Sequence, residues 1–122
     1  MRRLGRLSRR AFGQSLGASL ALAMLPRPVP ASDAPRVVEV RISDFAFNPE
    51  RVEIATGDTI VWINEDLAPH TATATDGDWD TGAIRKGKEA RVTFESQGAF
   101  EYFCAFHPHM TGTVTVRPRH GG

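Results

Sequence analysis

Cysteine is nearly absent from this chain of 122 residues, in which Cys104 is the only one. A single cysteine excludes an intramolecular disulfide, so no covalent cross-link stabilises the fold. In an oxidising compartment, an unpaired cysteine indicates an intermolecular bridge, a reactive thiol or a metal ligand. A buried apolar cysteine is the remaining alternative.

Sustained helical periodicity is also missing from residue 32 onward, where apolar and polar residues alternate instead. Short segments of this kind, separated by Gly, Asn and Asp turn signals, predict an all-β domain built as a β-sandwich or barrel. We expect the segment 59–63 to be buried on both faces, 44–48 to be a short irregular link, and 76–88 to be a long loop from which Trp79 folds back onto the domain. The expected strands lie at 38–42, 52–54, 59–63, 90–94, 99–104 and 114–116.

The N-terminus has the features of an export signal. Residues 1–10 carry five arginines and no acid, residues 11–25 are apolar, and small residues follow at 29–31. The apolar stretch is too short for a stable membrane span, which needs about 20 apolar residues. We therefore predict a signal peptide at 1–31, cleaved after Ala31 or Ala34, and a periplasmic product. The run 8–12, Ser-Arg-Arg-Ala-Phe, favours the twin-arginine route over general secretion.

Clustered positive charge is lacking once the signal is removed. From Ser32 onward the chain keeps nine Lys and Arg against 14 Asp and Glu, a formal balance of −5. Such a balance argues against nucleic acid as a partner. The 91 residues that remain suffice for one core. We predict one metal-binding domain at 32–117 and a flexible tail at 118–122.

The run Cys104-Ala105-Phe106-His107-Pro108-His109-Met110 carries the chemistry of the chain. A thiolate, an imidazole and a thioether at three-residue spacing are ligand types of a blue-copper site, which takes two His and one Cys with a weak axial Met. His70, after the segment 59–64, is placed to supply the second imidazole, because His120 lies in the tail. The predicted copper ligands are His70, Cys104, His107 and Met110.

The sequence argues against four other functions: an enzyme, a copper chaperone or storage protein, a structural zinc site and a calcium site. An enzyme needs an open coordination position or a second metal, yet only His109 and His120 remain as strong nitrogen ligands. A periplasmic copper chaperone or storage protein, the main alternative, favours exposed Met and His clusters, whereas Met110 is the single Met after the signal. A structural zinc site leaves the Met without a purpose. The acids of 76–80 lack a calcium-binding loop pattern.

Several motifs together resemble the cupredoxins, and more specifically the amicyanin and plastocyanin-like branch with its short Cys-x-x-His-x-x-Met loop. The resemblance covers nearly all of the chain after the signal. It implies a Greek-key β-sandwich that holds one type 1 copper ion and serves as a soluble electron carrier. We expect a monomer, because an electron carrier gains from short-lived contacts. The matching pieces are Gly57-Asp58-Thr59, Val61-Trp62-Ile63-Asn64, Pro69-His70, Gly98-x-Phe100-x-Tyr102-x-Cys104, His107-Pro108 and Met110-x-Gly112.

The same resemblance implies a quinoprotein amine dehydrogenase as electron donor and a c-type cytochrome as acceptor. We expect His107 to be the electron port, inside a small apolar patch formed by Phe106, Pro108, Ala68 and Leu67. Three positions depart from the family pattern: Phe106, His109 and Thr71. His109 either adds a titratable group to the patch or faces water. Thr71 stands where many cupredoxins have Asn, and its hydroxyl is expected to tie the two ligand loops together.

Overall fold

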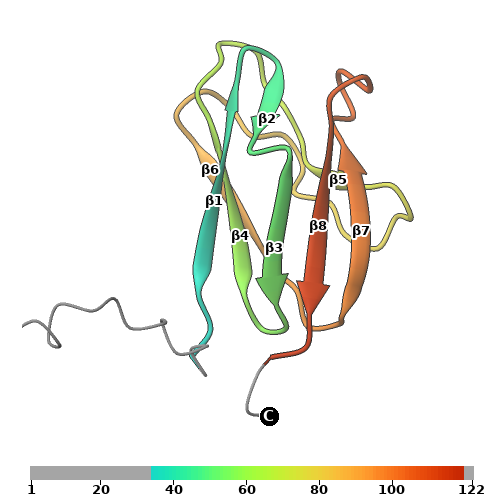
Figure 1. The fold of residues 1–122 in the computed structure, drawn as a ribbon. Helices are drawn as coiled ribbons and strands as arrows, with labels where there is room; N and C mark the ends of the chain where they lie inside the picture. The colour runs from blue at the N-terminus through green and yellow to red at the C-terminus, as the bar shows by residue number, and fades with distance from the viewer. Residues whose placement is uncertain (1–33, 120–122) are drawn as a thin grey trace, which may run out of the picture. The chain divides into compact units, whose positions relative to one another are not determined.

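Two four-stranded β-sheets pack into a sandwich in the computed structural model, which describes residues 34–119 (Figure 1). The strand order is β2-β1-β4-β6 in one sheet and β3-β8-β7-β5 in the other. Each sheet is mixed, because β1 pairs in parallel with β4 and β3 in parallel with β8. The predicted all-β sandwich is confirmed. The strands are β1 Val37–Ser43, β2 Ala46–Asn48, β3 Arg51–Ala55, β4 Thr59–Asn64, β5 Thr73–Ala74, β6 Glu89–Thr93, β7 Gly98–Phe103 and β8 Thr111–Arg117.

Alternation in the sequence decides which side chains enter the space between the sheets. Val40 and Ile42 of β1 are fully buried, and Val114 and Val116 of β8 are also buried. Their polar neighbours on the same strands point outward, as the period of two requires. Among residues 34–119 there is no helix, and hence none that could cross a membrane.

The central strand β4 is buried on both faces, as predicted. Ile60 and Trp62 face the core and are fully buried. Val61 points to the other side but is only 3% exposed. It lies in register between Glu39 of β1 and Arg91 of β6, so the stems of two long charged side chains can cover it.

Aromatic rings fill the middle of the core. Trp62 stacks on Trp79 with ring centroids 5.5 Å apart, and Tyr102 meets the Trp62 ring at 5.4 Å. Trp79 belongs to the long loop between β5 and β6, so the prediction that it folds back onto the domain is confirmed. The packing fixes the middle of a loop whose later part contacts the candidate site.

One expectation about local structure is wrong, and one short strand was missed. The segment 44–48 is not an irregular link, because Ala46–Asn48 forms β2 and pairs antiparallel with β1. The reversal is made by Asp44 and Phe45, which both have positive φ, 54° and 56°. Consecutive positive φ values are typical of tight hairpins, but a bulky aromatic rarely adopts them, so the sequence gives no hairpin signal here. The short strand β5 was also not expected.

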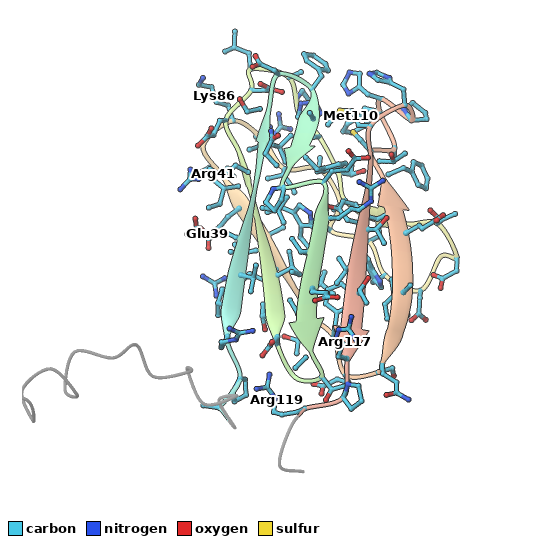
Figure 2. The ribbon with its side chains drawn as sticks, viewed as in Figure 1. Glu39, Arg41, Lys86, Met110, Arg117 and Arg119 are labelled. Carbon is cyan, nitrogen blue, oxygen red and sulfur yellow. The ribbon has the colours of Figure 1, made fainter. Side chains whose placement is uncertain are left out.

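The predicted signal peptide at 1–31 lies outside the described residues. Of the tail predicted at 118–122, the structure describes Pro118 and Arg119. The Arg119 guanidinium donates to the Thr56 carbonyl oxygen at 2.9 Å and to the carboxylate of Asp58. These contacts close the end of the sandwich at which β8 finishes (Figure 2).

Candidate metal centre

Three of the four predicted ligands meet at the opposite end of the sandwich. The donor atoms of His70, Cys104 and His107 all lie within 4.8 Å of one another. The Cys104 Sγ is 3.6 Å from Nδ1 of His70 and 3.7 Å from Nδ1 of His107. His70 and Cys104 are fully buried and His107 is partly exposed. We call this end of the molecule the metal end.

These distances can be tested against a metal ion. Nitrogen and sulfur donors bind first-row metals at about 2.0 and 2.3 Å. With about 110–120° between the two bonds, the nitrogen and sulfur atoms then lie about 3.5–3.7 Å apart. The two sulfur-to-nitrogen distances in the structure, 3.6 and 3.7 Å, lie within this range. The three side chains are therefore positioned for one ion, and a donor set of two imidazoles and one thiolate matches a type 1 copper site.

The loop between β7 and β8 places three donor residues through its own backbone. His107 N–H donates to the Cys104 carbonyl oxygen at 3.1 Å, and Met110 N–H donates to the His107 carbonyl oxygen at 2.9 Å. Cys104 N–H closes the loop by donating to the Met110 carbonyl oxygen at 3.1 Å. Met110 is 2% exposed and belongs to the same buried cluster as Cys104. Its side chain is thus buried in the cluster that contains Cys104, and its thioether could serve as the weak fourth donor of a type 1 copper ion.

Asn64, at the end of β4, holds the loop that carries His70. Its side-chain nitrogen donates to the carbonyl oxygens of Ala68 at 2.9 Å and of Ile84 at 2.8 Å, and its oxygen accepts from Asp66 N–H at 2.8 Å. The backbones of His70 and Ile84 exchange two further hydrogen bonds. Asn64 itself is fully buried, and its bond to the Ile84 carbonyl oxygen is shielded from water.

Asp66 orients the His70 ring. Its Oδ2 lies 2.9 Å from His70 Nε2, which leaves Nδ1 of the same ring directed at the sulfur. A metal-bound histidine usually donates its other N–H to a carboxylate or carbonyl oxygen, which fixes the tautomer and the ring orientation. Asp66 supplies that carboxylate, a role that the sequence analysis did not foresee.

The same carboxylate holds the hairpin between β1 and β2. Asp66 Oδ1 accepts from Asp44 N–H at 2.8 Å, and Oδ2 accepts from Phe45 N–H at 2.9 Å. Burial alone would raise the pKa of Asp66, but the Phe45 N–H, the His70 side chain and the Asp44 N–H outweigh it and hold the pKa below its usual value. Two backbone donors thereby keep Asp44 and Phe45 in a conformation that is otherwise disfavoured.

Phe45 was also missed from the sequence. Its ring meets the His70 ring at 5.0 Å and the His107 ring at 4.8 Å, both edge to face. The two imidazoles themselves lie 5.1 Å apart. Phe45 therefore packs against both imidazoles although it precedes them by 25 and 62 positions in the sequence. No local motif marks it.

Thr71 joins the two ligand loops, as expected from its position after His70. Its backbone N–H points at Cys104 Sγ at 3.4 Å, and its hydroxyl oxygen accepts from Ala105 N–H at 2.7 Å. Both contacts reach across from the β4–β5 loop to the β7–β8 loop. The short threonine side chain is thus long enough for the link that an asparagine makes elsewhere in the family.

Comparison with known proteins agrees with this geometry. Residues 15–116 match the cupredoxin-like domain family. The chain belongs to the cupredoxins. It is 33% identical to the amicyanin of Paracoccus versutus over 96 residues, which cover 74% of this chain and 73% of that one. It is 30% identical to the amicyanin of Paracoccus denitrificans over 114 residues, which cover 87% and 86%.

Solved structures show the same relationship. The crystal structure of the P. versutus amicyanin aligns with a TM-score of 0.61 at 32% identity, covering 75% of this cupredoxin and 92% of the amicyanin. A copper-containing nitrite reductase from Thermus scotoductus aligns with the same TM-score at 30% identity, but only 26% of that enzyme is covered. The amicyanins thus match over most of their own length, whereas the enzyme shares one domain-sized part. The cofactor of this cupredoxin is one type 1 copper ion.

Proposed function

We propose that this cupredoxin is an exported one-electron carrier and that His70, Cys104, His107 and Met110 are its copper ligands. When bound, copper supplies a single-electron Cu(I)/Cu(II) couple. The observation that carries the proposal is the meeting of two imidazole Nδ1 atoms at 3.6 and 3.7 Å from one buried sulfur.

Rigidity supports a role in electron transfer. Asn64 holds the His70 loop and Asp66 holds the His70 ring. Thr71 links the β4–β5 loop to the β7–β8 loop by a hydrogen bond. Donor atoms fixed by so many hydrogen bonds keep one arrangement, so little nuclear motion accompanies a change of one electron. A site that stays the same in both oxidation states exchanges electrons rapidly.

Exposed apolar rings lie beside the partly exposed His107, with the Phe45 and Phe106 ring centroids 4.8 and 6.5 Å from its own. We call Phe45, Leu67 and Phe106 the apolar rim; their exposed fractions are 44%, 85% and 52%. Large apolar side chains exposed at one end of a small domain mark an interaction site. Short-lived redox encounters use small interfaces, below about 1,200 Å² in total. The rim supports docking of a partner with its redox centre facing His107.

Partners and location extend the proposal. We propose that an amine dehydrogenase with a quinone cofactor donates the electron and that a c-type cytochrome accepts it, as the kinship with amicyanins suggests. Residues 1–31 direct export to the periplasm, with Arg9 and Arg10 favouring the twin-arginine route. Conservative replacement of both arginines by lysine should retain the full-length precursor in the cytoplasm. Continued export of that variant would favour general secretion.

The buried donors argue against the alternatives. His70, Cys104 and Met110 are each at most 2% exposed. A copper chaperone needs donors that a partner protein can reach, and an enzyme needs a coordination position left for substrate. Here three of the four proposed donors are buried, so a partner protein cannot reach them, and four protein donors leave no coordination position for a substrate. We therefore propose no catalytic activity.

Electron self-exchange tests the function with the protein alone. Mixing the copper-loaded Cu(I) and Cu(II) forms should give rapid exchange, seen as broadening of the NMR signals of residues near the metal end. Replacing Leu67 by Glu should slow the exchange, because two copies would then meet with like charges at the rim, while the reduction potential stays the same. Slow exchange in the wild type would contradict a role as an electron carrier.

A further inference from the structure

Unpaired positive charge gathers in one turn of the chain. The described residues include nine Lys and Arg, and five of these lie within ion-pair distance of a carboxylate. The five are Arg36, Arg41, Arg91, Arg117 and Arg119. The other four have no such partner within residues 34–119, and they are Arg51, Arg85, Lys86 and Lys88. Three of the four therefore fall within residues 85–88, which we call the basic turn.

Hydrogen bonds to Asn64 fix the position of the basic turn. Gly87 N–H donates to the Asn64 carbonyl oxygen at 2.7 Å, and Asn64 N–H donates to the Lys88 carbonyl oxygen at 3.0 Å. Lys88 N–H closes the turn by donating to the Arg85 carbonyl oxygen at 2.9 Å. Gly87 has a φ of 78°, which glycine adopts without strain. Because Asn64 also holds the loop of His70, the basic turn and a proposed copper ligand share one anchor.

The basic turn adjoins the apolar rim. Lys86 Nζ donates to the Glu65 carbonyl oxygen at 3.3 Å, and Leu67, the most exposed member of the rim, follows two residues later. Figure 2 shows Lys86 at the same end of the sandwich as Met110. The side chains of all three cations of the turn are exposed. Positive charge and exposed apolar surface thus meet at the metal end.

Carboxylates around the basic turn leave it with an excess of positive charge. Glu65 is paired with Arg41, and Glu89, the residue after the turn, is paired with Arg91 at 3.1 Å. Asp44, on the β1–β2 hairpin, is exposed and has no ion pair within residues 34–119, so it supplies one opposing charge at this end. The turn stays positive although the chain from Ser32 onward has a formal balance of −5.

We propose that the basic turn and the apolar rim together form the docking surface for a redox protein whose own contact surface is acidic. Carboxylates of the partner pair with the basic turn, and its apolar contact residues pack on the rim beside His107. The inference rests on the proposed electron-carrier function and adds the chemistry of the partner to it.

The two parts of this surface have separate tasks. Opposite charges speed the encounter of two proteins and orient them, whereas an exposed ion pair adds little affinity. Small interfaces are typical of weak redox encounters. Steering by the turn followed by a small contact at the rim therefore gives fast association and fast release, as an electron carrier needs. Because the turn is fixed on Asn64, it presents its charges in one position relative to the rim.

The first test places the effect of charge on the surface. Hexacyanoferrate(III), a one-electron oxidant with three negative charges, stands in for an acidic partner and oxidises the copper-loaded, reduced protein in a stopped-flow experiment. Arg85→Gln should slow this reaction about threefold at low ionic strength, the scale of one unit charge acting on a trianion across water. Arg51→Gln is the matched control, because it removes an exposed and unpaired arginine outside the turn. Equal rates in the two variants would overturn the proposal.

The sign of the charge is tested with the triple variant Arg85→Gln, Lys86→Gln, Lys88→Gln. Its oxidation by hexacyanoferrate(III) should be about 10-fold slower than that of the wild type, and the difference should disappear at about 1 M salt, where the Debye length is about 3 Å. Its oxidation by tris(phenanthroline)cobalt(III), a cationic oxidant, should be faster. Slower reaction with both oxidants would show that the substitutions disturb electron transfer itself and would contradict docking at the turn.

A measurement without electron transfer separates this inference from the proposed function. Hexacyanochromate(III) is a paramagnetic anion that broadens the NMR signals of nearby amides, and it can be added to the protein with or without Cu(I). Signals of residues 85–88 and of Leu67 should broaden first, and the triple variant should lose this effect. Such a result supports the anionic docking surface even if electron self-exchange proved slow. Even broadening over the whole domain would refute it.

Anionic lipid is the other surface that a basic turn could meet. The copper-loaded protein should stay in the supernatant when vesicles of phosphatidylserine and phosphatidylcholine are sedimented. Co-sedimentation of the wild type that the triple variant abolishes would assign the turn to a membrane surface and would overturn the proposal of an acidic protein partner.

Discussion

The two ends of the sandwich, marked in Figure 2 by Arg119 and by Met110, each have an aspartate that accepts hydrogen bonds from the backbone, but the two aspartates have different roles. At the end where β8 finishes, Asp58 accepts from Ala55 N–H at 2.9 Å, from Arg36 N–H at 2.8 Å and from the Arg119 side chain. At the metal end, Asp66 accepts from two backbone N–H groups and faces a histidine ring.

The difference lies in the third partner. The third partner of Asp58 is Arg119, which is part of the scaffold, so Asp58 links the ends of strands. The third partner of Asp66 is His70, a proposed metal ligand, so Asp66 links the scaffold to the site. The same use of a carboxylate to collect backbone donors stabilises the fold at one end and orients a ligand at the other.

Removing Asp58 should have the largest effect on stability. Asp58→Ala removes the acceptor of two part-buried backbone N–H groups and one of the acceptors of a partly buried guanidinium, which we expect to lower the free energy of unfolding by about 3–5 kcal/mol. Urea unfolding of the metal-free protein measures the loss. The visible spectrum of the copper-loaded variant should be unchanged, and a spectral change would show that the two ends are not independent.

Gly112 tests packing beneath the metal end. A Cβ added there would lie 2.4 Å from Cζ of the buried Tyr102 ring, a distance that neither group can relieve without a shift. We expect Gly112→Ala to cost about 1–3 kcal/mol or more, in the range of overpacked cores. Combining it with Tyr102→Leu should recover part of the loss in a double-mutant cycle. Additive losses would contradict a direct clash.

Removing Asp66 should affect the metal more than the fold. Asp66→Ala frees the His70 ring and the β1–β2 hairpin, so we expect copper affinity to fall about 10- to 100-fold. Competition with a copper chelator measures this change. Glu65→Ala is the control, because Glu65 is exposed and pairs with Arg41 away from the donors. A similar loss in both variants would remove Asp66 from the site.

Lowering the pH should show how much the ionised Asp58 side chain contributes to the stability of the wild-type protein. Burial alone would raise the pKa of Asp58, but N–H donors from Ala55 and Arg36 and the Arg119 guanidinium lower it below its usual value. A depressed folded-state pKa gives stabilisation that is present above the unfolded value of about 3.9 and is lost as the pH falls through the folded value.

The measurement is unfolding of the metal-free protein as the pH is lowered below about 5, where such stabilisation begins to disappear. The wild type should lose more stability than Asp58→Ala over this range, because the variant has already lost the contribution. Parallel pH curves for the two proteins would show that Asp58 is ionised equally easily in both states.

The smallest expected effect on the fold is at the apolar rim. Leu67→Ala removes a side chain that is 85% exposed, so the free energy of unfolding should stay within about 0.5 kcal/mol of the wild-type value. Electron self-exchange should nonetheless slow several-fold, as two copies lose apolar contact. Unchanged exchange would place the docking surface elsewhere.

Local signals in the sequence were sufficient to propose the donors. Cys104, His107 and Met110 fall within seven positions, and the alternation of β7 continues to the residue after it, so Cys104 is buried on the same side as Tyr102. The all-β sandwich followed from the same alternation. These features depend on neighbours in the chain, which is why a sequence pattern can predict them.

The supporting residues depend on contacts far along the chain. Asp66 bonds to residues 21 and 22 positions away, and Phe45 meets both imidazoles from a hairpin that its own propensity disfavours. Only the fold brings these side chains to the metal end, so no local pattern distinguishes them beforehand.

The most direct test of the account is a visible absorption and EPR spectrum of the copper-loaded wild type, recorded beside Cys104→Ser and Met110→Leu. We predict an intense blue thiolate-to-copper band with narrow copper hyperfine splitting, abolished in Cys104→Ser and retained but shifted in Met110→Leu. A colourless copper complex, or a spectrum that survives in Cys104→Ser, would contradict a type 1 site at the metal end.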